Sequence, residues 1–226
     1  MIDDPLIATA RLGKTAVVVV VPMSTMRTLH DQEVRIAEVM TPDRRREFTA
    51  GRIAAREALR LVGGPDVAIG IGAAGEPLWP AGFVGSVSHT RTHAAAFVAT
   101  SSDYLSVGVD LDDERALDDA AASDLMTPEE VQRVVSAGFA ADVPTAQRFV
   151  FSAKEAVFKC QYPLAGDANL DFLDIELIES ARSGGPSRLV ASWRAAKERS
   201  IKRRIEVFPL RIQGPAIVVA VATALC

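Results

Sequence analysis

One stretch near the middle of the second half of the chain combines an acid and an amine at a spacing that could do chemistry. Residues 151–159 read Phe-Ser-Ala-Lys-Glu-Ala-Val-Phe-Lys, and nothing in this run breaks a helix. Glu155 and Lys159 are four residues apart, so on a helix they share one face. The plainer interpretation is a surface ion pair, which stabilises a helix by about 0.2–0.5 kcal/mol.

A second acidic cluster lies far upstream. Residues 106–112 read Ser-Val-Gly-Val-Asp-Leu-Asp, a pattern typical of a strand that ends in two carboxylates. Because a strand alternates faces, Asp110 and Asp112 point the same way, and Glu114 is a further candidate ligand if the strand continues. The run could instead be a solvated acidic turn. If the two stretches meet, three carboxylates and a lysine form a set that suits a divalent cation such as magnesium and a phosphate.

The composition narrows the classes of protein to consider. The chain has 226 residues, 49% of them hydrophobic, which is enough for one large domain or two small ones. Its net charge of −4 argues against a general nucleic-acid binder. Cys160 and Cys226 form no Cys-x-x-Cys motif, no signal-peptide pattern opens the chain, and the apolar run at 17–21 is too short to span a bilayer. We therefore expect a cytoplasmic protein without a disulfide framework or a membrane segment.

The predicted elements repeat one order. A strand at 16–21 precedes a helix at 41–62, which Thr41 caps and Pro42 begins. A capping box at Thr127 starts another helix, and a long helix at 145–162 is closed by Pro163. Strands are expected near 66–71, 83–88, 93–100 and 104–111 in the first round, and near 171–179, 188–193, 204–211 and 216–224 in the second.

This repetition predicts an α+β fold of two related subdomains, residues 1–112 and 113–226. Each would be a helix packed on a mostly antiparallel sheet. Because the acidic strand end closes the first half and the Glu155 helix belongs to the second, the site should lie in the cleft between them.

Four motifs occur in an order and at spacings that resemble a known family. They are Gly75-Glu76-Pro77-x-Trp79-Pro80, Gly85-Ser86-Val87-Ser88-His89, Gly108-Val109-Asp110-Leu111-Asp112 and the run from Phe151 to Lys159. Together they resemble the 4′-phosphopantetheinyl transferases of the surfactin and enterobactin type, and the helix that begins near Arg44 resembles the enterobactin branch.

This resemblance implies a pseudo-twofold monomer that uses coenzyme A and magnesium. Such an enzyme moves the phosphopantetheine arm onto a serine of an apo acyl or peptidyl carrier protein and releases adenosine 3′,5′-bisphosphate. The carriers of the family serve fatty-acid, polyketide or nonribosomal-peptide synthesis.

The resemblance also assigns roles to residues. Magnesium would be held by Asp110, Asp112 and Glu155, with the Leu111 carbonyl. Glu155 would be the general base, directly or through a water. Lys159 would stabilise charge on the leaving phosphate, with Lys154 as a further phosphate contact. The 3′-phosphate would be held by Ser88, His89, Arg44 and Arg52.

Several positions keep alternatives open. His89 could be a structural hydrogen-bonding residue, Arg44 a solvated helix residue, and Arg56 a partner for a carboxylate. No lysine stands between Arg60 and Arg91, so backbone N–H groups would have to contact phosphate near the Gly75 turn. The basic run 194–204 could be a docking patch or a solvated loop, and Phe139 a carrier contact or a core residue.

Two other functions remain: a magnesium-dependent hydrolase of nucleotide or coenzyme A pyrophosphates, and a non-catalytic carrier-binding module.

Overall fold

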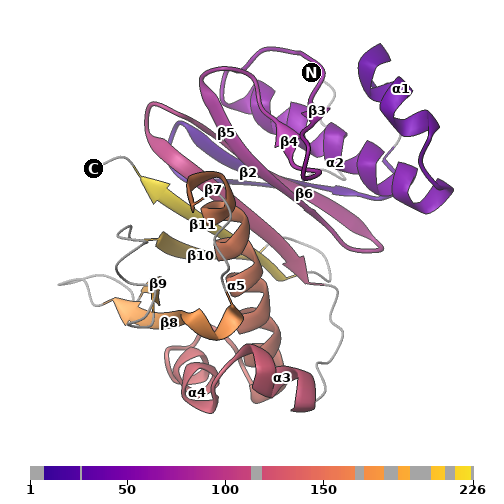
Figure 1. Cartoon of the computed structure of the whole chain (residues 1–226). Helices are drawn as coiled ribbons and strands as arrows, with labels where there is room; N and C mark the ends of the chain where they lie inside the picture. The colour runs from indigo at the N-terminus through magenta and orange to yellow at the C-terminus, as the bar shows by residue number, and fades with distance from the viewer. Residues whose placement is uncertain are drawn as a thin grey trace.

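Two antiparallel sheets, each with a long helix against one face, make up the described part of the chain (Figure 1). The structure is a computed structural model, and it describes residues 8–25, 27–112, 119–165, 171–180, 188–193, 205–211 and 217–224. Every strand pairing among these residues is antiparallel. The predicted α+β class is confirmed.

A run of valines forms an inner strand of the first sheet, β2 (Ala16–Pro22). The strand order is β1 (Ala8–Arg11), β2, β6 (His93–Thr100) and β5 (Phe83–His89). The odd-numbered valines of β2 pack toward helix α2, and the even-numbered ones face the second sheet. Both faces of the strand are therefore buried, which explains why its sequence is continuously apolar.

Helix α2 (Pro42–Leu61) covers the outer face of the first sheet (Figure 1). The Thr41 side chain accepts a hydrogen bond from the backbone N–H of Arg44, and Gly63 follows the helix at φ +78°, a conformation that glycine adopts easily. The helix predicted at 41–62 is confirmed. The structure adds α1 (Asp31–Glu38) and a short hairpin of β3 (Gly70–Ile71) and β4 (Pro77–Leu78), so only the end of the strand expected near 66–71 forms.

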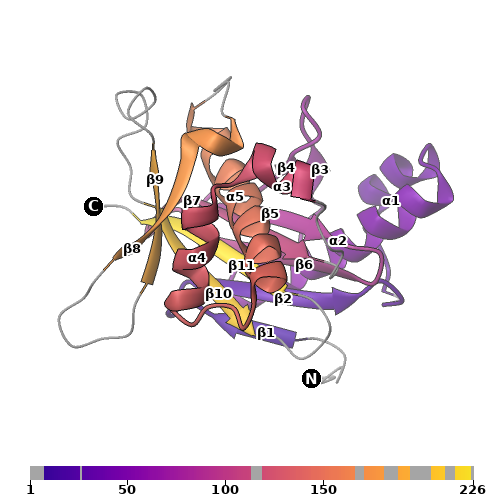
Figure 2. The same cartoon turned by 90° about the horizontal axis from the view of Figure 1, so that it is seen from below.

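The second sheet has the order β7 (Tyr104–Asp112), β11 (Ile217–Ala224), β10 (Ile205–Arg211), β9 (Arg188–Trp193) and β8 (Ile175–Ser180). Helix α5 (Val143–Ala165) lies across it, with α3 (Asp119–Leu125), α4 (Pro128–Ser136) and the short 3₁₀ helix η1 (Phe172–Asp174) at one end (Figure 2). The capping box predicted at Thr127 forms at the start of α4. Pro163 does not end α5, which continues to Ala165 with the proline inside its last turn.

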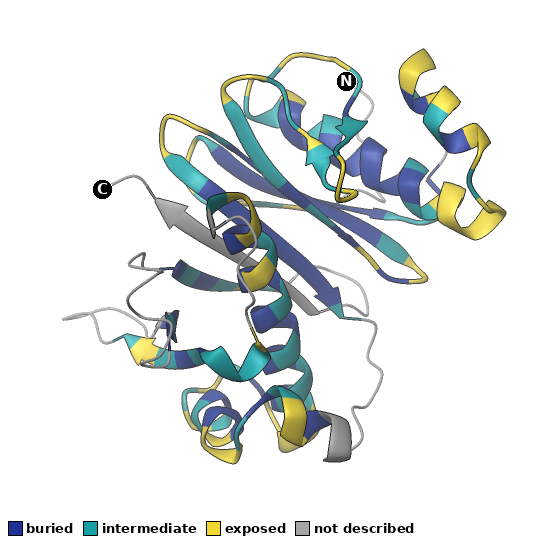
Figure 3. Ribbon diagram, viewed as in Figure 1, coloured by how far each residue is buried: buried dark blue, intermediate teal, exposed yellow. Residues whose placement is uncertain are grey.

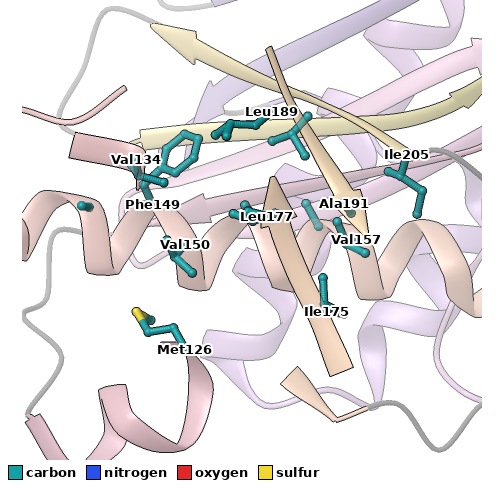
Figure 4. Close-up of a cluster of buried hydrophobic side chains, with 14 of the residues drawn as sticks. Met126, Val134, Phe149, Val150, Val157, Ile175, Leu177, Leu189, Ala191 and Ile205 are labelled. Carbon is teal, nitrogen blue, oxygen red and sulfur yellow. The ribbon is translucent and has the colours of Figure 1, made fainter. Parts of the chain in front are cut away.

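The core has three layers of apolar side chains. One layer lies between α2 and the first sheet, and another lies between the sheets, where Val107, Val109 and Leu111 of β7 pack on β2 and β6. The third lies under α5, where Phe149, Val150 and other residues of the helix meet the inner face of the second sheet (Figure 4). Figure 3 shows the buried residues running along the inner strands and along the helix faces turned toward them. No helix in the described ranges is long and apolar enough to cross a membrane.

Strand β7 lies at the junction of the two halves. The predicted boundary assigned residues 104–112 to the first subdomain, but β7 is hydrogen-bonded to β11 in the second sheet along its length. Its odd-numbered apolar residues still pack on the first sheet. By hydrogen bonding, therefore, β7 belongs with the second half, and the division at residues 112 and 113 stays a prediction.

Candidate active site

The strand β7 and the helix α5 run side by side with matched spacing. Asp112 accepts a hydrogen bond from Arg148 at 3.1 Å, and Asp110 accepts one from Ser152 at 2.9 Å. Two residues of a strand advance about 6.6–6.8 Å and four residues of a helix advance 6.0 Å, so the partners stay in register. One step further, a Cβ on Gly108 would lie 2.0 Å from the Ala156 carbonyl oxygen. This glycine lets the helix backbone approach the strand.

Asp110 is the centre of a buried polar cluster. Its Oδ1 accepts hydrogen bonds from Lys159 Nζ at 2.6 Å and from Ser88 Oγ at 2.8 Å, while its Oδ2 accepts the bond from Ser152. Lys159 Nζ also donates to Ser88 Oγ at 3.2 Å. The cluster joins β5 of the first sheet to β7 and α5 of the second half. The two stretches that the sequence placed at one site are therefore in contact.

Glu155 lies on the same side of α5 as this cluster, three residues after Ser152 and four before Lys159. Burial raises the pKa of the Glu155 carboxyl above its usual value, the charge of Lys159 lowers it, and the charge of Asp110 raises it further. Its spacing on α5 places Glu155 on the helix face that carries Ser152 and Lys159, the two side chains of α5 that bind Asp110. A half-buried carboxyl with a raised pKa is suited to accepting a proton.

His89 lies beside a second set of charged side chains at the end of β5. Arg44 Nη1 is 3.1 Å from His89 Nε2 and 3.1 Å from Glu47 Oε2. Since arginine only donates, Nε2 must accept this hydrogen bond. Burial lowers the pKa of His89, Arg44 and Lys159 lower it as well, and Glu47 and Asp110 oppose them. This lowered pKa favours the neutral imidazole. Because His89 directly follows Ser88 in β5, the two sets of polar side chains lie next to each other.

The side chains of Ser88 and His89 point to opposite faces of β5. Adjacent residues of a strand point to opposite faces, so Ser88 faces Asp110 while His89 faces Arg44 on α2. The Ser88 hydroxyl is buried and, besides its bond to Asp110, accepts from Lys159 and from the Leu111 N–H. The hydroxyl thus belongs to the Asp110 cluster, and the predicted contact of Ser88 with the 3′-phosphate stays a prediction.

Lys154 lies apart from the Asp110 cluster. Its side chain is fully buried on the side of α5 that faces α4 and η1. Its ammonium donates to Glu130 Oε2, to the Leu125 carbonyl and to the Phe172 carbonyl at 2.9–3.0 Å. An ammonium has three N–H donors, and these three acceptors can use all of them. Lys154 is therefore an ion-pair partner of Glu130 in this structure, and its contact with a phosphate stays a prediction.

Arg52 is held within the first half of the chain. It is 5% exposed, donates to the carbonyls of Ile69 and Gly70, and lies over the Phe48 ring. Burial lowers its pKa to about 10. Arg52 thus anchors the start of the β3–β4 hairpin, and its contact with a 3′-phosphate stays a prediction. Arg56 pairs with buried Glu33, in agreement with the alternative that it binds a carboxylate.

The predicted magnesium ligands are only partly assembled. Asp110 and Glu155 lie near each other, whereas Asp112 pairs with Arg148 and the Leu111 side chain packs on the first sheet. Within the described ranges, no group of three or more His, Cys, Asp or Glu side chains is arranged to hold a metal ion. Glu114 and the basic run 194–204 lie outside the described residues. The oxygen donors of Asp110 and Glu155 have the chemistry that magnesium prefers.

Three residues of the site were not singled out from the sequence. Arg148 and Ser152 precede Glu155 by seven and three residues, which is helical spacing on one face, so this signal was present. Glu47 stands three residues after Arg44 and follows the same rule.

Phe139 is partly buried and stacks on Phe149, so it packs against the core rather than serving as a free surface contact.

Comparison with known proteins gives matches along most of the chain. The 4′-phosphopantetheinyl transferase N-terminal domain matches residues 31–99, and the 4′-phosphopantetheinyl transferase superfamily matches residues 106–217. The chain is 36% identical over 165 residues to 4′-phosphopantetheinyl transferase Svp from Streptomyces mobaraensis, covering 72% of this chain and 66% of the relative.

Two further relatives agree with this match. The chain is 35% identical over 135 residues to 4′-phosphopantetheinyl transferase Npt from Nocardia iowensis, with 60% of each chain covered. It is 36% identical over 137 residues to enterobactin synthase component D from Escherichia coli, covering 60% of this chain and 62% of the relative. The matches therefore span less than two thirds of the length of these relatives. A crystal structure of a holo-(acyl-carrier-protein) synthase from Bacillus anthracis shows a weaker likeness, with 22% identity, a TM-score of 0.34, and 42% of this chain and 96% of that chain covered.

Proposed function

Because the chain belongs to the 4′-phosphopantetheinyl transferase superfamily, we propose that it transfers the phosphopantetheine arm of coenzyme A to a serine of an apo carrier protein. The observation that carries the proposal is the buried cluster in which Lys159 and Asp110 meet beside Glu155. In the reaction the serine oxygen bonds to the β-phosphorus of the pyrophosphate. The bond from that phosphorus to the bridging oxygen breaks, and adenosine 3′,5′-bisphosphate leaves with the electron pair.

Glu155 is the proposed base for the serine proton. Its raised pKa improves its affinity for a proton, and its side chain is only half-buried. Lys159 is the proposed partner of the leaving phosphate, because a positioned ammonium stabilises the charge that grows there as the bond breaks. Asp110 holds the Lys159 ammonium in place through the 2.6 Å ion pair.

Magnesium, when bound, would offset the charge of the pyrophosphate. Asp110 and Glu155 are the residues that would hold the ion. Asp112 could become a further ligand only if its ion pair with Arg148 were broken. Arg44 and His89 are the proposed contacts of the 3′-phosphate, because an arginine fork matches phosphate oxygens and His89 faces the same side. Coenzyme A and the apo carrier are thus the proposed partners.

The site is built from elements of a single chain, so we propose that the enzyme acts as a monomer. A cytoplasmic place of action is also proposed, since Cys160 is a buried thiol that forms no disulfide, as is usual in reducing compartments.

The test is a panel of apo acyl and apo peptidyl carriers, each incubated with the protein, coenzyme A and magnesium and analysed by mass spectrometry. The expected result is the gain of one phosphopantetheine on at least one carrier, and no gain when the carrier serine is replaced by alanine. Cleavage of coenzyme A with every carrier unmodified would instead indicate a pyrophosphate hydrolase. Magnesium-independent carrier binding without any modification would indicate a binding module.

A further inference from the structure

One of the predicted magnesium ligands is paired with an arginine of α5. Arg148 Nη1 donates a hydrogen bond to Asp112 Oδ2 at 3.1 Å. The side chain of Arg148 is 15% exposed and that of Asp112 is 10% exposed, so both are largely shielded from water. Removal of either partner would leave the other charge without compensation in a poorly solvated place.

Arg148 belongs to the same stripe of α5 as the side chains of the candidate active site. Residues 148, 152, 155 and 159 follow one another at intervals of four, three and four, which keeps them on one face of the helix. Asp110 and Asp112 share one face of β7 and lie about 6.6–6.8 Å apart along the strand. The pair of Arg148 with Asp112 is therefore the next contact beyond Asp110 between the same strand and helix.

Each acid of this strand face is matched with one cation of α5. Lys159 pairs with Asp110 at 2.6 Å, as Arg148 pairs with Asp112. Together with Glu155, these side chains carry three formal negative and two formal positive charges, a sum of −1. Loss of the Arg148 charge would make the set more negative at the place where a divalent cation would be held, and oxygen donors with more negative charge bind such ions more tightly.

The Arg148–Asp112 pair is less enclosed than the structural ion pair of the same helix. Lys154 and Glu130 are both 0% exposed, and Lys154 also donates to two backbone carbonyls. Arg148 reaches Asp112 through the single nitrogen Nη1, whereas an arginine that clamps a carboxylate often uses two nitrogens. A partly exposed contact at one nitrogen is suited to opening when another cation competes for the carboxylate.

We propose that Arg148 is a positioning residue that occupies Asp112 in the metal-free protein and releases it when magnesium binds, an inference that rests on the proposed function. Arg148 thereby sets the affinity of the site for the ion. It compensates the charge of a largely buried acid while no metal is present, and it must be displaced before Asp112 contributes an oxygen. Asp110 keeps its place through its bonds to Ser152 and Ser88 during this exchange.

The test measures metal binding by the full chain without coenzyme A or a carrier. Calorimetry with Mg²⁺ and electron paramagnetic resonance with Mn²⁺ are applied to the wild type, Arg148→Gln, Arg148→Lys, Asp112→Asn and the double variant of Arg148→Gln with Asp112→Asn. Arg133→Gln is the matched control, because Arg133 also pairs with a carboxylate, that of Glu176, at 3.2 Å. Glu176 lies on β8, which is four strand spacings from β7, or about 19 Å at about 4.8 Å each.

Arg148→Gln is expected to bind Mg²⁺ about tenfold more tightly, equal to about 1.4 kcal/mol. The same change should gain less than about threefold in the Asp112→Asn background, because the released carboxylate is the source of the gain. Arg148→Lys keeps the positive charge and should stay within about threefold of the wild type, as should Arg133→Gln. Equal gains in both backgrounds would show that Arg148 acts only through its charge. That result, or a weaker affinity in Arg148→Gln, would overturn the proposal.

Thermal unfolding provides a readout even where Arg148→Gln folds poorly. Its Tm should be lower than that of the wild type without metal, and Mg²⁺ should raise it by more, because an ion that binds the folded state stabilises it in proportion to its affinity. A variant that Mg²⁺ does not stabilise would contradict the proposal. So would a higher KM for coenzyme A at saturating Mg²⁺, which would instead make Arg148 a phosphate contact.

The outcome for Arg148 is separate from the outcome for the transferase function. If the metal affinities follow the prediction but no carrier in the panel is modified, the transferase function fails and the role of Arg148 stands. If a carrier is modified while Arg148→Gln and the wild type bind Mg²⁺ equally, the role of Arg148 fails and the transferase function stands.

Discussion

Lys159 Nζ lies 2.6 Å from Asp110 Oδ1, so the lysine proposed to contact the leaving phosphate is paired with the acid near the end of β7. The two residues are 49 positions apart in the sequence. Asp110 belongs to the acidic motif at 108–112 and Lys159 to the motif at 151–159. The pair holds an ammonium beside Glu155 before any substrate arrives. Such fixed charges need no rearrangement when charge develops in a transition state.

Asp110→Asn is expected to reduce the rate of transfer by at least about a hundredfold, because it removes the charge that holds Lys159 and a proposed metal ligand. It should also lower the free energy of unfolding by about 1.5–3 kcal/mol, since a hydrogen bond between charged groups becomes weaker. Rapid-quench transfer and urea unfolding measure the two effects. The control is Asp103→Asn in an exposed turn, which should leave the rate unchanged. A wild-type rate in Asp110→Asn would remove Asp110 from the site.

Glu155→Gln should lower turnover about a hundred- to ten-thousandfold, because the proposed base is lost while the side-chain size is kept. Binding of coenzyme A at the Arg44 and His89 end should change little. The same variant should be more stable than the wild type at pH 7. Burial raises the folded-state pKa of Glu155, so its ionised form disfavours the folded state, and this penalty appears as pH rises through the ordinary value of 4.5 and the raised folded value.

Thermal unfolding of Glu155→Gln at several pH values checks the sign. Below the ordinary pKa of 4.5 the wild-type carboxyl is protonated in both states, so the difference in Tm between the two proteins should shrink. A gain in Tm that is largest at low pH would contradict the assigned environment. Normal turnover would reduce residues 151–159 to a salt-bridged helix face.

His89→Ala should weaken binding of coenzyme A about ten- to a hundredfold and leave dephospho-coenzyme A, which lacks the 3′-phosphate, nearly unaffected. Arg44→Ala should act in the same direction, since the two side chains share one hydrogen bond. Calorimetry with both ligands measures the difference. Equal losses for the two ligands would place His89 away from the 3′-phosphate.

The pKa of His89 should respond in opposite directions to its two neighbours. Arg44→Ala removes a positive charge that lowers this pKa, so the pKa should rise, whereas Glu47→Gln removes a negative charge that raises it, so the pKa should fall. NMR titration of the imidazole C–H signals measures both shifts without substrate. Shifts of the same sign would show that His89 does not lie between these side chains.

Lys154→Met should destabilise the protein by about 3–5 kcal/mol, because it leaves the Glu130 carboxylate buried without its cation. The double variant Glu130→Leu with Lys154→Met should recover part of this loss. At a temperature where it is folded, Lys154→Met should keep the wild-type affinity for coenzyme A. A selective loss of that affinity with unchanged stability would instead support the phosphate contact predicted for Lys154.

Features of the fold and the site that depend on neighbouring residues could be predicted from the sequence, whereas features that depend on contacts between distant segments could not. Periodicity and capping residues are local, so they located α2, the α4 capping box and the faces shared by Asp110 with Asp112 and by Glu155 with Lys159. The partners of buried cations depend on contacts between distant segments. Lys154 lies next to Glu155 in sequence, but its position on α5 directs it toward Glu130 and away from the cluster. Strand alternation alone predicts that Ser88 and His89 face opposite sides of the sheet, whereas the family resemblance assigned both residues to the 3′-phosphate.

The hydrogen-bonding partner of β7 could not be predicted for a similar reason. Its pattern as a strand was clear, but its hydrogen-bonding partner β11 is more than 100 residues away, and register between such segments leaves no mark in a local window. Pro163 was expected to end a helix because it lacks an N–H. Pro163 instead lies within the last turn of α5, and the helix continues for two more residues, to Ala165.

The matched spacing of β7 and α5 limits how related sequences can change in length. One residue inserted into α5 between Arg148 and Ala156 would rotate everything after it by about 100° and turn Glu155 and Lys159 away from Asp110. One residue inserted in β7 between Gly108 and Asp112 would reverse the face of the acids that follow it. Natural length variation among relatives should therefore gather outside these two segments. The spacing within residues 108–112 and 148–159 is therefore as constrained as the identity of the side chains that meet there.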